Sequence, residues 1–311
     1  MRDDVDELLD LTTNPGDRLW RYPIGRWAVR YVMDTPITPH HVTALHAAIG
    51  AATGFVIAQG TPRAWLLAGV MYELRSILDC FDGVVARAKK LSSPMGRALD
   101  ETADTIGFVS LMGGTAACLA RVYGWATAIA VVALCSMISA SCTTAWDFFK
   151  RRYTSLIKQG RDTTEEEFLA LWRDYDERPA LSLWVAKAVA TWQWLTLSPA
   201  AFQRLRARAA RGDYGTPGEN APPTPAARWL REAAARRDPE LRSTLVRVGF
   251  VAGDNVILLL TVGLLLGQLL NVLPLAMAYG VALWTVTVVA ANRLLHEAGE
   301  RAEAQADVRT P

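Results

Sequence analysis

The chain has 311 residues, of which 51% are hydrophobic and 21% are charged, and its formal net charge is +2. A net charge so close to zero argues against a nucleic-acid-binding protein, because binding to phosphates requires an excess of Lys and Arg. The apolar residues gather in long runs that contain few charges, and each run is about as long as a helix that crosses a lipid bilayer. These features together argue against a soluble protein with a single core.

The N-terminal region, residues 1–41, is predicted to lie on the cytoplasmic surface of the membrane. Its first 20 residues are acidic and contain no apolar segment, so we expect no cleavable signal peptide. Residues 17–30 place four apolar side chains on one face of a helix among several arginines: Trp20, Ile24, Trp27 and Ala28. This pattern is typical of an amphipathic helix at a membrane interface.

Four apolar segments follow within residues 42–147. Thr61-Pro62 predicts a helix start, because Thr is a favoured N-cap and Pro fits the first helical turn. The chain reverses again at a turn that contains Gly124. Each segment is long enough to cross a hydrocarbon layer of roughly 30 Å. The expected spans are 42–59, 62–82, 96–121 and a fourth that ends near Trp146.

Two further spans are expected in residues 245–297, followed by a tail at 298–311. The helix that contains the fifth span is predicted to start at Asp238-Pro239 and to run to Leu270, and the sixth span to end near Asn292. Six spans place both termini on one side of the membrane. Lys and Arg are enriched on that side, so the positive-inside rule makes it cytoplasmic. The predicted fold is thus an all-α integral membrane protein with six transmembrane helices, placed in the cell inner membrane.

A polar insert, residues 148–244, separates the fourth and fifth spans and is predicted to be helical and cytoplasmic. Thr163 or Thr164, followed by glutamates three residues on, indicates the start of one helix, and Thr224-Pro225 the start of another. The Trp-rich segment 181–197 fits an interfacial helix, with a re-entrant or weak seventh span as the alternative. Residues 212–224 are rich in Gly and Pro and are expected to form a loop.

The most informative segment is 79–104. Asp79 and Asp82 are three residues apart near the end of the second span, and Asp100 and Asp104 are four apart at the start of the third. Each pair therefore lies on one helical face. Because the two helices are antiparallel neighbours, the pairs lie at the same depth. Four close carboxylates repel one another unless a positive charge lies among them, and hard oxygen ligands favour Mg²⁺ or Mn²⁺.

The residues between the two Asp pairs indicate a space for a phosphate-bearing ligand. Gly83 and Ala86 leave room beside the carboxylates, and Arg87 can hold phosphate oxygens with two hydrogen bonds. Asp and Arg at helix ends are often only solvated caps, and this is the alternative for any one of them. Four Asp at these spacings around Gly-x-x-Ala-Arg favour a pyrophosphate site, since carboxylates at the edge of an apolar layer are costly.

The pattern Asp-x2-Asp-Gly-x2-Ala-Arg-x8-Gly-x3-Asp-x3-Asp resembles the full signature of the CDP-alcohol phosphotransferase family. The resemblance implies transfer of a substituted phosphoryl group from a CDP-linked donor to an acceptor alcohol, with release of CMP, in phospholipid biosynthesis. It implies that Asp79, Asp82 and Asp100 ligate two metal ions, and that Asp104 completes the ligation and acts as the general base. It also implies a homodimer.

The same resemblance implies the residues that contact the donor, a CDP-diacylglycerol-like or other CDP-alcohol molecule. Here a histidine replaces the asparagine that is usual in the cytidine-side segment, and the alternative for this segment is a simple interfacial helix start. The implied donor contacts are Thr38, Pro39, His40, Thr43, Gly83, Ala86, Arg87 and Ser93.

Candidates for acceptor binding carry weaker signals. Lys150 and Arg152 belong to a basic cluster after the fourth span that could bind a phosphorylated acceptor, although such clusters are usually topology determinants. Asp254 lies within the fifth span, where an acidic side chain faces a cavity or forms a structural hydrogen bond.

Two other functions share some of these features. An aromatic prenyltransferase of the membrane also uses Asp-rich helices and pyrophosphate, but two separated Asp-rich motifs are expected there and only one is present. A non-catalytic transporter or cation-binding protein could hold a divalent ion in the acidic cluster, but it gives no purpose to the Gly-x-x-Ala-Arg segment.

Overall fold

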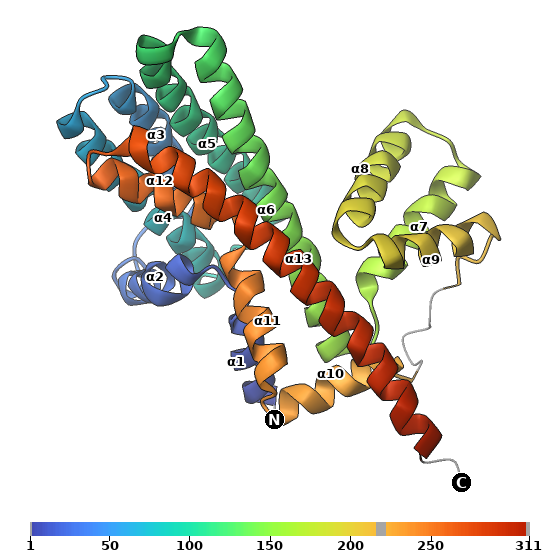
Figure 1. The fold of residues 1–311 in the computed structure, drawn as a ribbon. Coiled ribbons are helices and arrows are strands. Elements are labelled where there is room, and N and C mark those ends of the chain that lie inside the picture. Colours follow the sequence, from blue (N-terminus) through green and yellow to red (C-terminus); the bar gives the residue numbers. More distant parts are fainter. Residues whose placement is uncertain (1, 216–221, 309–311) are drawn as a thin grey trace. The chain divides into compact units, whose positions relative to one another are not determined.

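The structure is a computed structural model that describes residues 2–215 and 222–308. These residues form helices and loops without any β-strand, so the predicted all-α class is confirmed (Figure 1). The chain divides into two compact units, each described here by itself. The motif unit comprises Thr13–Ser141 and Gly253–Val281, and the insert unit comprises Met1–Thr12, Cys142–Ala252 and Ala282–Pro311.

The motif unit is built around three helices that lie side by side: α3 (Pro39–Ile57), α4 (Pro62–Ala88) and α5 (Pro94–Tyr123). Two more helices pack on α4, namely α2 (Tyr22–Ala28) and α12 (Gly253–Leu265). The backbones of α3 and α5 are in direct contact: a Cβ atom at Gly54 would lie 2.4 Å from the carbonyl oxygen of Ser110. Small residues at such crossings allow helices in membranes to approach closely.

Several predicted helix starts are confirmed by cap hydrogen bonds. The hydroxyl of Thr61 accepts a hydrogen bond from the backbone N–H of Ala64 at 3.2 Å, at the start of α4. The predicted start at Asp238-Pro239 is confirmed too, because the carboxylate of Asp238 accepts hydrogen bonds from the backbone N–H groups of Glu240 and Leu241. The cap of α5 was not predicted: the hydroxyl of Ser93 accepts a hydrogen bond from the backbone N–H of Gly96 at 3.0 Å. The Ser93 cap fixes the end of the turn between α4 and α5, and this turn follows the first pair of aspartates and precedes the second.

The number of membrane spans is only partly confirmed. Among the described residues, three helices are long and apolar enough to cross a membrane: α5, α6 (Trp125–Gln159) and the part of α13 (Leu269–Val308) that ends at Ala302. A fourth is added if α11 (Pro239–Phe250) and α12 count together as one span. The predicted first two spans form α3 and α4, but polar side chains lower their hydropathy, so the six-span layout stays a prediction.

The fifth span differs from its prediction. We expected one helix from Pro239 to Leu270, but the structure interrupts it after Phe250 and starts α12 at Gly253. The sequence Val251-Ala252-Gly253-Asp254 carries the break. Gly has a low helix propensity and Asp favours helix starts, which explains why the helix ends here.

The amphipathic segment after residue 16 is helical but is not one regular helix. It forms a π-helical turn (Asp17–Arg21), α2 and a 3-10 turn (Val29–Tyr31). Arg21 is buried and donates two hydrogen bonds of 2.9 Å to the carboxylate of Glu73 on α4. Trp20 donates to the same carboxylate at 2.7 Å. Of the predicted apolar face, Ile24 and Trp27 are exposed, whereas Trp20 is held against α4 by this bond.

The insert unit is helical, as predicted. Besides α11 and parts of α6 and α13, it contains α1 (Arg2–Asp10), α7 (Thr163–Glu177), α8 (Leu181–Leu197), α9 (Pro199–Ala210) and α10 (Pro225–Ala235). The predicted cap of α7 at Thr163 or Thr164 is wrong: Asp162 is the N-cap and accepts hydrogen bonds from the backbone of Thr164 and Glu165. Part of the predicted loop 212–224 lies outside the described residues.

The Trp-rich helix α8 has both buried and exposed aromatic residues. Trp194 is buried against Phe148 and Phe168, whereas Trp184 and Trp192 are exposed. The helix has 17 residues. This exposed aromatic face is compatible with the predicted interfacial position, which stays a prediction.

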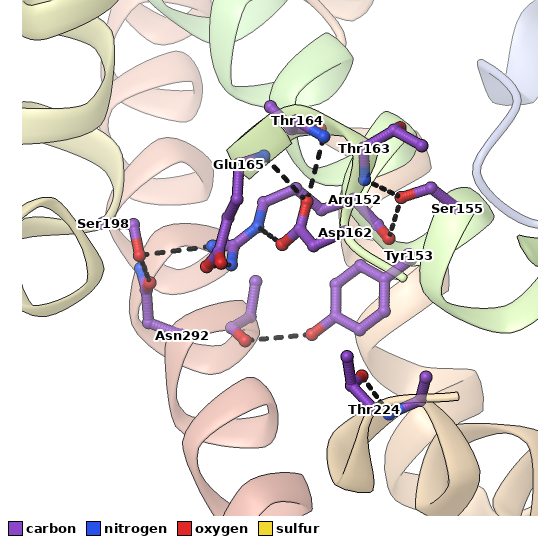
Figure 2. A network of polar contacts seen from close by, with 12 residues as sticks. Arg152, Tyr153, Ser155, Asp162, Thr163, Thr164, Glu165, Ser198, Thr224 and Asn292 are labelled. Atoms are coloured by element: carbon purple, nitrogen blue, oxygen red, sulfur yellow. Dashed lines mark hydrogen bonds and ion pairs between the residues drawn. The ribbon is translucent and has the colours of Figure 1, made fainter. Parts of the chain in front are cut away.

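A buried ionic network joins several helices of the insert unit (Figure 2). The guanidinium of Arg152 on α6 binds Asp162 at 2.7 Å and Glu165 at 3.1 Å, and it donates a hydrogen bond to the hydroxyl of Ser198 at 3.3 Å. Ser198 in turn donates to Asn292 on α13 at 2.7 Å. The network therefore connects α6, α7, α9 and α13 through one buried arginine.

We predict that Asp162→Ala destabilises the insert unit far more than a matched cap removal. The variant leaves the charge of Arg152 buried without its nearest partner, which costs about 3–5 kcal/mol in comparable pairs. Asp238 caps α11 in the same way, through Glu240 and Leu241. Asp238→Ala is expected to cost only about 1 kcal/mol. Thermal unfolding of the purified variants measures the difference, and equal destabilisation would contradict the role given to Arg152.

Candidate functional site

The four aspartates of the motif meet in the motif unit, as their spacing predicted. Asp79 and Asp82 lie near the end of α4, and Asp100 and Asp104 lie in the first part of α5. Carboxylate oxygens of Asp79 and Asp104 lie within 4.8 Å of each other and of a ring nitrogen of His46. Carboxylate oxygens of Asp82 and Asp100 also lie within 4.8 Å of each other and of a ring nitrogen of His46. The carboxylates thus form two groups that share one histidine.

His46 was not identified from the sequence. It lies on α3, and its side chain is fully buried. The Nε2 atom lies 3.4 Å from Oδ2 of Asp82 and 3.7 Å from Oδ1 of Asp100. One signal could have found it: His46 follows Thr43 by three residues, so both lie on one face of the helix.

Thr43 contacts the same aspartate from α3. Its hydroxyl lies 2.7 Å from Oδ2 of Asp82 and 3.0 Å from the carbonyl oxygen of Pro39, so its single proton serves one of the two acceptors. Asp82 itself is buried. Thr43 therefore helps to hold a buried carboxylate in place, in agreement with its predicted position at the site.

Arg75 on α4 is the second residue of the cluster that was not identified from the sequence. Its buried guanidinium forms an ion pair with Asp104 and lies over the ring of Tyr72, 5.3 Å from its centroid. Two glycines make room for it: a Cβ atom at Gly107 would lie 2.3 Å from Nε of Arg75, and one at Gly50 would lie 3.3 Å from the same atom. Arg75 thus brings one positive charge among the four carboxylates.

A pocket of about 350 Å³ opens beside Asp82 and Asp100. The turn between α4 and α5 supplies one side of it, and the start of α3 the other. Seven of the eight predicted donor contacts line this pocket, all except Thr38: Pro39, His40, Thr43, Gly83, Ala86, Arg87 and Ser93.

Local contacts position the start of α3 at this pocket. The ammonium of Lys89, just after α4, donates hydrogen bonds of 2.8 Å to the carbonyl oxygens of Thr35 and Ile37. Thr38 is the N-cap of α3, and its backbone N–H donates to Nδ1 of His41 at 3.2 Å. Thr38 and His41 therefore have capping roles, which leaves His40 as the histidine of this segment that faces the pocket.

The predicted acceptor contacts fall into two places. Asp254 lies in the motif unit, is exposed, and accepts a hydrogen bond from Asn14 at 3.4 Å. It is close enough to Asp104 to interact with it electrostatically. Lys150 and Arg152 belong to the insert unit. Lys150 lies over the ring of Trp146, and Arg152 is buried in the ionic network described above, so its charge is already used inside the fold.

The donor set fits a divalent cation. Carboxylate oxygens are hard ligands suited to Mg²⁺ or Mn²⁺, and imidazole adds a nitrogen. Both ring nitrogens of His46 and Oδ1 of Asp100 are buried and have no hydrogen-bond partner among the described residues. Buried polar atoms without partners are rare in folded proteins and often mark a place for an ion or water. These residues could therefore hold a metal.

The described residues combine membrane-length helices with a carboxylate cluster beside a pocket of about 350 Å³. Residues 36–161 match the family described as CDP-alcohol phosphatidyltransferase. The resemblance to that family is therefore confirmed over this segment, which contains α3, α4, α5 and α6 up to its end.

One relative from the curated proteins supports the same assignment. The bifunctional IPC transferase and DIPP synthase of Rubrobacter xylanophilus is 36% identical to this chain over 85 residues. The matched segment is 27% of this chain and 19% of the relative, so the similarity spans about a fifth of that protein's length. No solved structure shows a significant match to the chain.

We predict that Gly107→Ala disturbs the site although it adds only one methyl group. The new Cβ would lie 2.8 Å from Cζ of Arg75, so the guanidinium must leave Asp104 or the helices must separate, at a cost of about 1–3 kcal/mol. Gly113→Ala in the same helix is the matched control, because nothing lies within 4 Å of its Cβ position. Thermal unfolding compares them: Gly107→Ala should lower the melting temperature, and a rise equal to that of the control would contradict the packing.

Proposed function

We propose that the chain is a membrane-embedded, metal-dependent CDP-alcohol phosphotransferase of phospholipid biosynthesis. It transfers a substituted phosphoryl group from a CDP-linked donor, CDP-diacylglycerol or another CDP-alcohol, to the hydroxyl of an acceptor alcohol and releases CMP. The observation that carries the proposal is the pocket of about 350 Å³, which joins the predicted donor positions to Asp82 and Asp100 of the cluster.

The donor occupies this pocket with its pyrophosphate toward the aspartates. Arg87 holds phosphate oxygens, because a guanidinium binds them with two parallel hydrogen bonds. Gly83 and Ala86, which line the same pocket, have small side chains and leave room for the pyrophosphate. His40 faces the cytidine end, where it takes the place of the asparagine that is usual in the family.

Asp104 is the general base. Its side chain is about half exposed, and it is the aspartate of the cluster that is paired with Arg75. It accepts the proton of the acceptor hydroxyl, whose oxygen forms a bond to the phosphorus atom that carries the donor's alcohol. The bond from that phosphorus to the bridging oxygen breaks, and CMP leaves with the bridging oxygen. Asp254 is the residue proposed to contact the acceptor.

The four aspartates would hold two divalent ions, Mg²⁺ or Mn²⁺. When bound, such ions neutralise the charge of the pyrophosphate and of the leaving phosphate. Asp79, Asp82 and Asp100 serve as ligands, and Asp104 combines ligation with its role as base.

The family resemblance and the charges of the loops support a proposal for the membrane topology and the oligomeric state. We propose six membrane spans, with the site, the insert and both termini on the cytoplasmic side, and a homodimer as the working form. The excess of Lys and Arg in the 83–97 turn supports this orientation.

We predict that Asp104→Asn abolishes CMP release while the protein stays folded. An amide cannot accept the hydroxyl proton, and loss of a general base typically costs 10²–10⁴-fold in rate. Glu101→Gln is the matched control, an exposed acid on the same helix, and it should keep full activity. The assay follows CMP with panels of CDP-linked donors and alcohols. Release of pyrophosphate instead of CMP would identify a prenyltransferase, and normal turnover by Asp104→Asn would remove this residue from the mechanism.

We also predict that Arg87→Lys raises the KM for the CDP-linked donor more than it lowers kcat. Lys keeps the charge but loses the two-bond geometry toward phosphate. Arg63→Lys, an exposed position at the other end of α4, is the control. Steady-state CMP release at varied donor concentration separates the two constants, and an unchanged KM would show that Arg87 does not contact the donor.

A further inference from the structure

We infer that His46 supplies a nitrogen ligand to the metal centre, an inference that rests on the metal dependence of the proposed function. The site would then not be purely carboxylate, and it would bind Mn²⁺ and later transition metals in preference to Mg²⁺. The signature motif supplies only the aspartates. His46 comes from a different helix, α3, and adds a ligand of a different kind.

The position of the imidazole is the first argument. Two ligands of one ion at bond lengths of 2.0–2.1 Å lie at most about 4.2 Å apart. The Nε2 atom of His46 lies 3.4 Å from Oδ2 of Asp82 and 3.7 Å from Oδ1 of Asp100. Both distances fall within that limit, so these atoms could ligate one ion without a change of rotamer.

The burial of the imidazole is the second argument. The ring is completely buried, and neither of its nitrogens has a hydrogen-bond partner among the described residues. A buried polar group without a partner destabilises the folded state. A metal ion bound to one nitrogen removes part of this cost, and it does so in a place where four carboxylates require positive charge.

The main alternative is a protonated His46 that serves only as a counter-ion. A counter-ion should donate a hydrogen bond to its carboxylate. The Nε2 atom lies at ion-pair distance from Asp82 and Asp100 but meets hydrogen-bond geometry with neither. A protonated counter-ion and a metal ligand differ in one measurable respect: only the ligand gives a nitrogen coupling to bound Mn²⁺.

A nitrogen ligand has a consequence for metal choice. Mg²⁺ binds oxygen ligands and water, whereas imidazole suits transition metals, whose affinities rise from Mn²⁺ through Co²⁺ and Ni²⁺. We therefore expect Mn²⁺ to bind more tightly than Mg²⁺. Mutation of a residue that only supports a ligand costs about 10–100-fold in metal affinity, so His46→Ala, which removes a ligand, should weaken Mn²⁺ binding by at least about tenfold. Mg²⁺ binding should change less.

The experiment uses the full chain in detergent, loaded with Mn²⁺ alone, and pulsed electron paramagnetic resonance that detects directly bound ¹⁴N. The expected result is a nitrogen coupling that changes when the histidines carry ¹⁵N. The chain has four histidines, so variants assign the signal. It should vanish in His46→Ala and persist in His296→Ala, an exposed residue of the insert unit, and in His40→Ala, which tests the histidine that lines the pocket.

The outcomes separate this inference from the function on which it rests. If the Mn²⁺-loaded chain releases CMP but shows no nitrogen coupling, His46 is not a ligand and the function stands. If the coupling persists in His46→Ala, another histidine is the ligand and the inference is wrong. If the chain neither binds Mn²⁺ nor releases CMP, both proposals fail. Should His46→Ala not fold, the wild-type spectra with ¹⁴N and ¹⁵N histidine, together with His40→Ala, His41→Ala and His296→Ala, decide the question: a coupling that persists in all three variants belongs to His46, and one that vanishes in any of them does not.

Discussion

The repulsion among Asp79, Asp82, Asp100 and Asp104 is the constraint on which the motif unit depends. Asp79 and Asp104 have oxygens within 4.8 Å of each other, as do Asp82 and Asp100, and carboxylates so close cannot all stay ionised without positive charge nearby. Two contacts reduce this repulsion: the guanidinium of Arg75 forms an ion pair with Asp104, and the hydroxyl of Thr43 contacts Asp82 at hydrogen-bond distance. One guanidinium stands against four carboxylates, and His46 and Asp100 keep buried polar atoms without a hydrogen-bond partner among the described residues. A divalent cation would supply the missing positive charge and would give these atoms a partner.

The close packing of α3 against α5 brings side chains of α3 to the aspartate cluster. His46 and Thr43 reach the carboxylates because α3 lies in backbone contact with α5, and this contact requires small residues: a Cβ atom at Gly114 would lie 2.5 Å from the carbonyl oxygen of Gly54. Gly107 makes the space through which Arg75 reaches Asp104. Helix packing and site assembly are therefore not separate features, since one set of glycines permits both.

Local sequence predicts features that depend on local geometry. The spacing of the four aspartates placed them together, and the Thr-Pro and Asp-Pro pairs gave helix starts that the cap hydrogen bonds confirm. His46 and Arg75 were missed, because each is a single polar residue in a long helix and its partners come from another helix. The interruption after Phe250 was missed as well, since an apolar run does not show where a helix breaks. The span count and the residue roles stay predictions.

Charge balance explains why two buried ionic clusters in one chain have different functions. In the insert unit Arg152 faces Asp162 and Glu165, and burial raises the pKa of Glu165, with the charge of Asp162 adding to the effect. Arg152 thus has two carboxylate partners and one hydroxyl partner inside the fold, so this network needs no ligand and stabilises the fold. A basic residue after a membrane span does not reveal in the sequence whether its charge is paired inside the fold, as that of Arg152 is. The aspartate cluster does not reach this balance with the chain's own residues, and a site for a cation and a phosphate-bearing substrate is expected where balance is lacking.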